Sequence, residues 1–157
     1  MAGATVPKYH ILAATLPCLL ALLAGCVAPR RQVRLPDSGR IPFQNHCAAC
    51  HQYDGQGMGD APALAGSPWV TGPESRLIRI VLHGVRGPMV VDGKPYDQEM
   101  PGFSQILSDT ELAALLSYVR IRFGALREPV TAEMVSRERA ANRARTQYWR
   151  VDELDQP

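Results

Sequence analysis

Residues 45–51 read NHCAACH, in which two cysteines separated by two alanines are followed directly by a histidine. The spacing C-x-x-C-H is the attachment signature of c-type haem. In this chemistry the two thiols add across the two vinyl groups of the porphyrin, and the histidine is then held beneath the iron. We therefore predict one covalent haem c attached through Cys47 and Cys50, with His51 as the first ligand of the iron.

Three other interpretations of the same residues are weaker. A structural zinc site would take its second pair of ligands from far along the chain, whereas His46 and His51 lie in the same short turn as the cysteines. A thioredoxin-type redox pair favours a surrounding βαβ pattern, which is missing. A structural disulfide between Cys47 and Cys50 is conceivable, but it leaves a loop-rich chain with a small core without an organising group.

A second ligand of the iron is expected downstream, because histidine paired with methionine is typical of electron transfer. The candidates are Met58, Met89, Met100 and His83. Met58 lies only seven residues after His51, so it would reach the opposite face of the haem with difficulty. We favour Met100, because Pro101 and Gly102 stiffen and turn the chain directly after it. A lone methionine that only fills space is the alternative.

The apolar periodicity predicts a small number of helices joined by long loops. We expect helices that begin near residue 41 and span 74–83 and 109–123. Ser108 and Glu111 form a capping box at the start of the third helix. Glycine and proline residues are frequent in 52–73 and 85–102, so these segments are expected to be irregular.

The amino-terminal residues are typical of an export signal. Lys8 precedes an apolar run at 11–23, and residues 23–26 read LAGC. The run is too short to span a bilayer and Pro17 interrupts it, so a permanent transmembrane helix is the weaker interpretation. The LAGC stretch resembles the lipobox of bacterial lipoproteins. We therefore predict a lipid on Cys26, with an ordinary cleaved signal peptide as the alternative.

These features divide the chain into four parts: a lipoprotein-type signal peptide at 1–25, a flexible tether at 26–40, a haem domain at 41–125 and a charged, partly helical extension at 126–157. In the extension, Met134, Ala141 and Tyr148 recur seven residues apart. Such a narrow seam could pack on the domain or on a partner. A solvated extension is the alternative.

Residues 41–124 closely resemble a class I cytochrome c. The resemblance rests on CAACH at 47–51, on MPGF at 100–103 and on LSD at 107–109, which opens the last helix. It implies a small all-α fold with helices and long loops around one haem, in which the first and last helices cross. The crossing would use Phe43 and residues 115–118.

The same resemblance implies two further roles at the site. Met100 would be the second ligand of the iron, and the backbone carbonyl of Pro62 would accept a hydrogen bond from the other ring nitrogen of His51. A less specific resemblance, carried by residues 77–87, Met100-Pro101 and the Tyr148-Trp149 tail, is to cytochrome modules of quinoprotein alcohol and sugar dehydrogenases.

The expected function is electron transfer by a carrier rather than an enzyme, since protein ligands on both faces leave the iron no open position for a substrate. The expected partners are a periplasmic dehydrogenase as electron donor and another cytochrome or a terminal oxidase as electron acceptor. The lipid predicted on Cys26 would anchor the protein to the membrane. A net charge of +2 with scattered basic residues argues against nucleic acid. A haem peroxidase or a gas or redox sensor, with a labile second ligand, and a structural lipoprotein are the alternatives.

Overall fold

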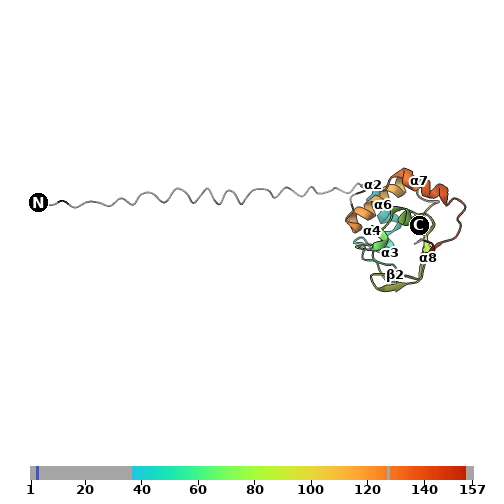
Figure 1. Cartoon of the computed structure of the whole chain (residues 1–157), viewed down its shortest axis with the longest axis horizontal. Helices are drawn as coiled ribbons and strands as arrows, with labels where there is room; N and C mark the ends of the chain where they lie inside the picture. Colours follow the sequence, from blue (N-terminus) through green and yellow to red (C-terminus); the bar gives the residue numbers. More distant parts are fainter. Residues whose placement is uncertain (1–2, 4–36, 127, 155–157) are drawn as a thin grey trace. The chain divides into compact units, whose positions relative to one another are not determined.

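Seven helices and five short strands make up the described part of the chain, which comprises residues 3, 37–126 and 128–154 of a computed structural model (Figure 1). The helices are α2 (Asp37–His46), α3 (Ala48–His51), α4 (Pro68–Thr71), α5 (Glu74–His83), α6 (Asp109–Gly124), α7 (Ala132–Ala141) and α8 (Val151–Leu154). The strands are β1 (Val85–Arg86), β2 (Met89–Val91), β3 (Lys94–Tyr96), β4 (Glu99–Met100) and β5 (Trp149–Arg150). The expected signal peptide, Cys26 and most of the tether lie outside the described residues.

The helices α2 and α6 cross at the centre of the core. Phe43 of α2 is fully buried, and its ring centroid lies 5.4 Å from that of Tyr118 and 5.2 Å from that of Phe123, both on α6. Gly39 lets the two backbones approach, since a Cβ at this position would overlap the carbonyl oxygen of Ala114. This crossing and the mostly helical fold confirm the predicted architecture.

The first helix begins at Asp37, four residues earlier than the sequence predicts, and Pro42 lies inside it. Because proline favours the first helical position, Pro42 predicts a start near residue 41. Contact with α6 overrides this preference, because Gly39 is buried against that helix. Residues 37–40 therefore belong to the domain and not to the tether.

The two later helices follow their sequence signals closely. Helix α5 spans the predicted residues and ends at Gly84, whose φ of 78° suits glycine. At the start of α6 the capping box is present: the hydroxyl of Ser108 accepts from the backbone N–H of Glu111, and the Glu111 carboxylate accepts from that of Ser108. Gly124 is the last residue of α6 and not its stop, which is Ala125 in the left-handed region.

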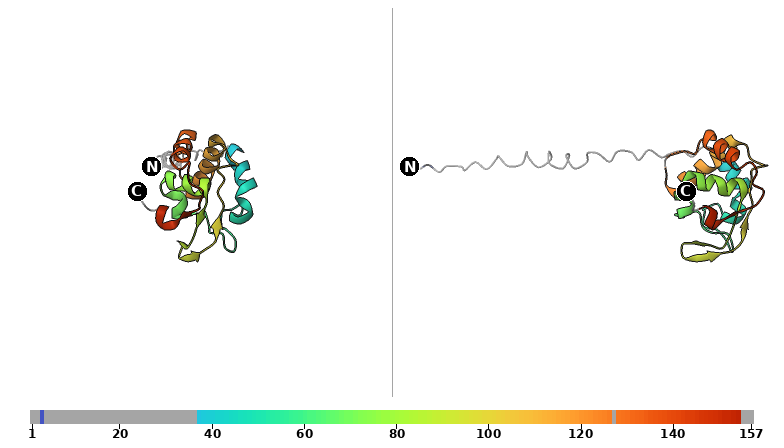
Figure 2. Two further views of the ribbon diagram at one scale, coloured as in Figure 1. Left: turned by 90° about the vertical axis from the view of Figure 1, so that its right-hand side faces the viewer. Right: turned by 45° about the vertical axis from the view of Figure 1, so that its right-hand side comes forward.

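Residues 85–100, expected to be an irregular loop, contain four short strands. The hairpin of β2 and β3 turns at Asp92 and Gly93, both with positive φ, and lies at the opposite end of the domain from the crossing helices (Figure 2). β1 pairs with β4 on one side and with β5 on the other. Each strand has only two or three residues, too few to produce an alternating pattern in the sequence.

The carboxy-terminal extension packs on the domain, but only part of the expected seam takes part. Met134 packs against the core, whereas Ala141 and Tyr148 are exposed. Val135, Trp149 and Leu154 are buried. Helix α7 is also fastened by ion pairs, including Arg79 to Glu138 at 2.8 Å and Arg139 to Asp109 at 2.7 Å. The extension therefore forms part of the folded domain.

The close approach at Gly39 makes a prediction about stability. Alanine inside a helix ordinarily stabilises it, but in Gly39→Ala the overlap with the α6 backbone should dominate and lower the free energy of unfolding by about 1–3 kcal/mol. Chemical denaturation followed by circular dichroism measures this change. The neighbouring exposed substitution Ser38→Ala is the control and should stay within about 0.5 kcal/mol of the wild type. Equal stability of both variants would contradict the proposed packing.

Candidate haem site

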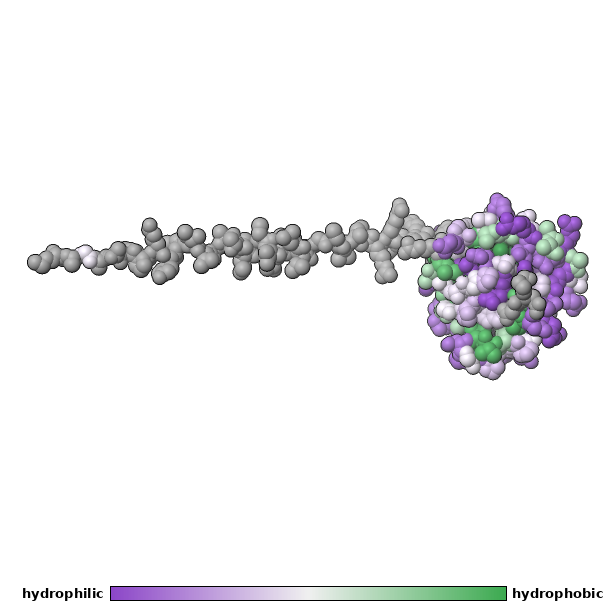
Figure 3. Space-filling view, viewed as in Figure 1, coloured by the Kyte–Doolittle hydropathy of each residue, from purple (hydrophilic) through white to green (hydrophobic). Residues whose placement is uncertain are grey.

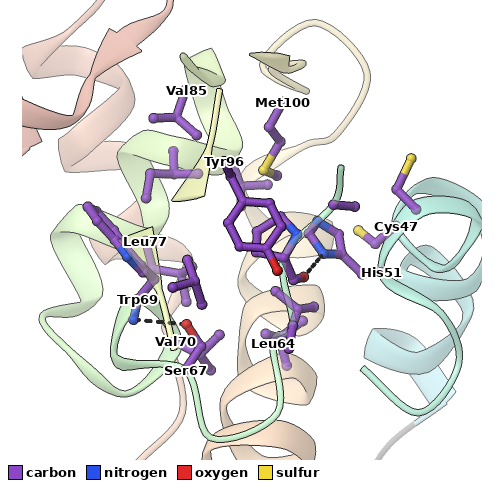
Figure 4. A pocket seen from close by; sticks show the side chains of 18 of the residues that line it. Cys47, His51, Leu64, Ser67, Trp69, Val70, Leu77, Val85, Tyr96 and Met100 are labelled. Carbon is purple, nitrogen blue, oxygen red and sulfur yellow. Dashed lines mark hydrogen bonds between the residues drawn. The ribbon is translucent and has the colours of Figure 1, made fainter. Parts of the chain in front are cut away.

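An apolar cavity of about 370 Å³ lies between the helices and the loops (Figure 4). Its walls come from the buried faces of two helices that lie far apart in the sequence, namely α5 with Leu77, Ile80 and Val81, and α6 with Leu115, Leu116 and Val119. A flat, largely apolar group is the kind of ligand that such walls fit. The cavity is therefore suited to a porphyrin.

The C-x-x-C-H residues lie along one side of this cavity. Cys47 is buried and Cys50 is exposed, and both line the cavity together with His51. The short helix α3 places them there: the backbone N–H of Cys47 donates to Phe43 O at 2.8 Å, and that of His51 donates to Cys47 O at 2.9 Å. The chain thus turns once after α2 and carries two thiols and one imidazole to one side of the cavity.

The thiol chemistry of this turn does not suit a redox pair. Burial, with a smaller contribution from neighbouring Cys50, raises the pKa of the Cys47 thiol to about 12. A thioredoxin-type pair works through a thiolate, which requires a lowered pKa. Within residues 37–126 and 128–154, no three His, Cys, Asp or Glu side chains converge to hold a metal ion, which also argues against the zinc interpretation.

The imidazole of His51 is held by one hydrogen bond. Its Nδ1 lies 3.0 Å from the carbonyl oxygen of Pro62, so Nδ1 carries the proton and donates. Burial lowers the pKa of His51, and the hydrogen bond to Pro62 opposes this only in part, so the ring stays neutral. The lone pair of Nε2 is then available to iron.

The turn before Pro62 positions its carbonyl. The backbone N–H of Gly57 donates to His51 O at 3.0 Å, and a Cβ on Gly57 would overlap the backbone of Ala61 and Pro62. With its φ of 73°, this glycine allows the chain to fold back tightly beneath His51. The irregular chain between His51 and Pro62 therefore positions the hydrogen-bond acceptor of the His51 ring.

Three of the four candidates for the second iron ligand line the haem cavity. Met58, Met89 and Met100 all line the cavity, whereas His83 lines a separate cavity beside α7. Met58 is 63% exposed, and its sulfur lies 3.6 Å from the side-chain amide of Gln52. Met100 is half-buried and packs against the apolar core. In Figure 4 the sulfur of Met100 and the ring of His51 both point into the cavity.

Two aromatic residues of the cavity were not predicted from the sequence. Trp69 and Tyr96 line it from α4 and β3, and both are half-buried. The hydroxyl of Ser67 caps α4, and the guanidinium of Arg76 lies 4.6 Å from the centre of the Trp69 ring. Both aromatics lie in segments rich in glycine and proline, where no periodicity reveals which side chains face inward.

The residues present fit a covalent haem. The thiols of Cys47 and Cys50 lie beside the apolar walls of the cavity, and the neutral imidazole of His51, with a free Nε2, enters the cavity from the same side. A methionine sulfur enters the same cavity from a different segment of the chain. These are the donors that a c-type haem with an axial histidine and methionine requires.

Comparison with known proteins agrees with this site. The family described as cytochrome c matches residues 37–121. Cytochrome c-552 of Thermus thermophilus is 38% identical over 114 residues, which cover 66% of this chain and 85% of that protein. The cytochrome c subunit of the quinone alcohol dehydrogenase of Gluconobacter oxydans is 34% identical over a match that covers 56% of this chain and 19% of that protein. The cbb3-type oxidase subunit FixP of Azorhizobium caulinodans is 30% identical over a match that covers 55% of this chain and 29% of that protein.

Replacing both cysteines tests covalent attachment. The double variant Cys47→Ser and Cys50→Ser should show no haem stain on a denaturing gel, because no thiol remains to form a thioether. His83→Gln is the matched control, since His83 lies outside the cavity, and its stain should equal that of the wild type. A stained band from the double variant would contradict the assignment.

Proposed function

The chain belongs to the cytochrome c family and transfers electrons with a covalent haem c, and from this premise we propose that its iron is ligated by His51 and Met100. The observation that carries the proposal is that these two side chains enter one apolar cavity from separate elements, α3 and β4. The proton on Nδ1 of His51 leaves Nε2 free to ligate. Thioether sulfur is the usual partner of histidine in electron-transfer haems.

The protein residues set how the site works, and the haem, when bound, supplies the one-electron chemistry of its iron. His51 keeps a fixed ring orientation through Pro62. As a ligand, the soft sulfur of Met100 would favour the reduced iron and raise the potential. The apolar walls exclude water and lower the local dielectric constant. Several residues that line the cavity are exposed, among them Ala49, Met58 and Gln98, so the cavity reaches the protein surface, and electrons would enter and leave there.

A haem peroxidase or a gas or redox sensor is the alternative function. It would need a second ligand that leaves easily. Met58 would be such a ligand, because its side chain is largely exposed and it belongs to a surface turn. Met100 favours the carrier, because it is half-buried and packs against two apolar clusters.

The substitution Met100→Ala tests the ligand directly. Oxidised His/Met haem shows a weak sulfur-to-iron charge-transfer band at the red end of the visible spectrum, and Met100→Ala should abolish it. Met58→Leu and Met89→Leu are the controls, because both change cavity-lining methionines and should leave the band intact. Persistence of the band in Met100→Ala would refute this ligand.

We also propose that a periplasmic dehydrogenase reduces this protein and that another cytochrome or a terminal oxidase oxidises it. Relatives that are cytochrome subunits of dehydrogenases and oxidases support redox proteins as partners. Near the cavity, Met58 and Val90 are each 63% exposed, and a hydrophobic patch lies where β2 reaches the surface (Figure 3). A small apolar patch suits weak, transient docking.

The proposed location is the periplasmic side of a membrane, with a lipid on Cys26. Residue 26 lies outside the described residues, and none of the described helices is long and apolar enough to cross a membrane. Lipid attachment would raise the local concentration of membrane-bound redox partners.

Metabolic labelling tests the lipid. When the full chain is expressed in a bacterium that processes lipoproteins, radiolabelled palmitate should enter the wild type and not Cys26→Ser. Cys18→Ser is the control and should be labelled like the wild type, because this cysteine lies within the segment expected to be removed. An unlabelled wild type would rule out the lipid anchor and leave the proposed electron transfer unaffected.

A further inference from the structure

Strand β5 lies beyond residues 37–121, the part of the chain that matches the cytochrome c family, yet it completes the sheet that contains Met100. We infer that Trp149 is a positioning residue that holds Met100 at the iron through β1. The inference rests on the proposed ligation by Met100. It gives the carboxy-terminal extension a role in electron transfer.

The sheet connects the two residues through a single intermediate. In β1, Val85 pairs with Met100 of β4 on one side and with Trp149 of β5 on the other. Because β1 has only two residues, its position depends on both neighbours. A side-chain ion pair between Arg86 and Glu99 adds to the pairing of β1 with β4.

The backbone just before β1 is also held from both sides. The N–H of Trp149 donates to Gly84 O at 3.0 Å. A Cβ on Gly84 would overlap both the carbonyl oxygen of Met100 and the ring of Tyr148. Gly84 therefore fills the narrow space between the ligand strand and the extension, and a shift of the extension would be transmitted to Met100.

The side chain of Trp149 packs against the rear of the cavity wall. It is 8% exposed and forms an apolar cluster with Ile80, Val85 and Leu154, against which Met100 also packs. Ile80, Val85 and Met100 line the haem cavity, whereas Trp149 does not. Trp149 thus acts on the site through its neighbours and not by touching the haem.

Charged residues hold the indole in place. The guanidinium of Arg145 lies 3.4 Å from the centre of the Trp149 ring and pairs with Glu153 at 2.5 Å. On α5, Arg79 lies 5.8 Å from the same ring and pairs with Glu138 of α7. These cations over an aromatic face stabilise the docked strand and tie it to both α5 and α7.

Displacement of Met100 by imidazole in the oxidised, full-length holoprotein tests the inference. Imidazole competes with the methionine for the iron. The apparent affinity of imidazole therefore rises by the same factor by which a variant weakens the bond between Met100 and the iron. Loss of the charge-transfer band reports the competition. We expect Trp149→Ala to bind imidazole about tenfold more tightly than the wild type, and Trp149→Phe, which keeps an aromatic ring, about threefold.

Val135→Ala is the matched control for a purely structural effect. Val135 is fully buried in α7, but it does not line the cavity. It should lower the unfolding midpoint while leaving the imidazole affinity within about twofold of the wild type. Wild-type affinity in both Trp149 variants, or an equal rise in Val135→Ala, would overturn the positioning role.

The Met100→Ala protein separates failure of this inference from failure of the proposed ligand. If Met100 is the ligand, this variant lacks the charge-transfer band even before imidazole is added. A band that persists in Met100→Ala overturns the ligand and the positioning role together. A band lost in Met100→Ala with unchanged imidazole affinity in the Trp149 variants overturns only the role of Trp149.

Discussion

The hydrogen bond from His51 Nδ1 to the carbonyl oxygen of Pro62 is the constraint on which the site depends. It fixes the tautomer and the orientation of the imidazole, and it holds the segment that follows α3 against the cavity. That segment continues into α4 and α5, which supply one wall. Because the thiols lie in the same turn as His51, one short stretch of chain would determine both where the haem attaches and how the proposed first ligand is oriented.

The opposite side of the site is built very differently. Met100 lies on a strand of two residues, which pairs with β1, and β1 pairs in turn with a strand from the carboxy-terminal extension. The His51 side is local in sequence, whereas the Met100 side joins segments that are far apart. Contacts of this kind form only when the whole domain is folded, so the proposed ligation by Met100 would depend on the complete fold.

This difference also explains what the sequence could predict. The C-x-x-C-H turn, α5 and the capping box of α6 depend on neighbouring residues and were found from them. The predicted start of α2 near residue 41 was wrong, because contact of Gly39 with α6 extends the helix. The strands at 85–100 and the burial of Trp149 were missed, since both depend on pairing between distant segments. Trp69 and Tyr96 were missed because α4 has only four residues and β3 only three, too few for a periodicity that shows which side chains face inward.

Proton NMR of the reduced holoprotein tests whether Met100 holds the haem together with His51. The ring current of the porphyrin would move the ε-methyl signal of a ligating methionine in the reduced protein far upfield of the ordinary range of protein signals. We expect one such signal, assigned to Met100 by its connectivity to β4. An upfield methyl assigned to Met58 or Met89, or the absence of any such signal, would contradict it.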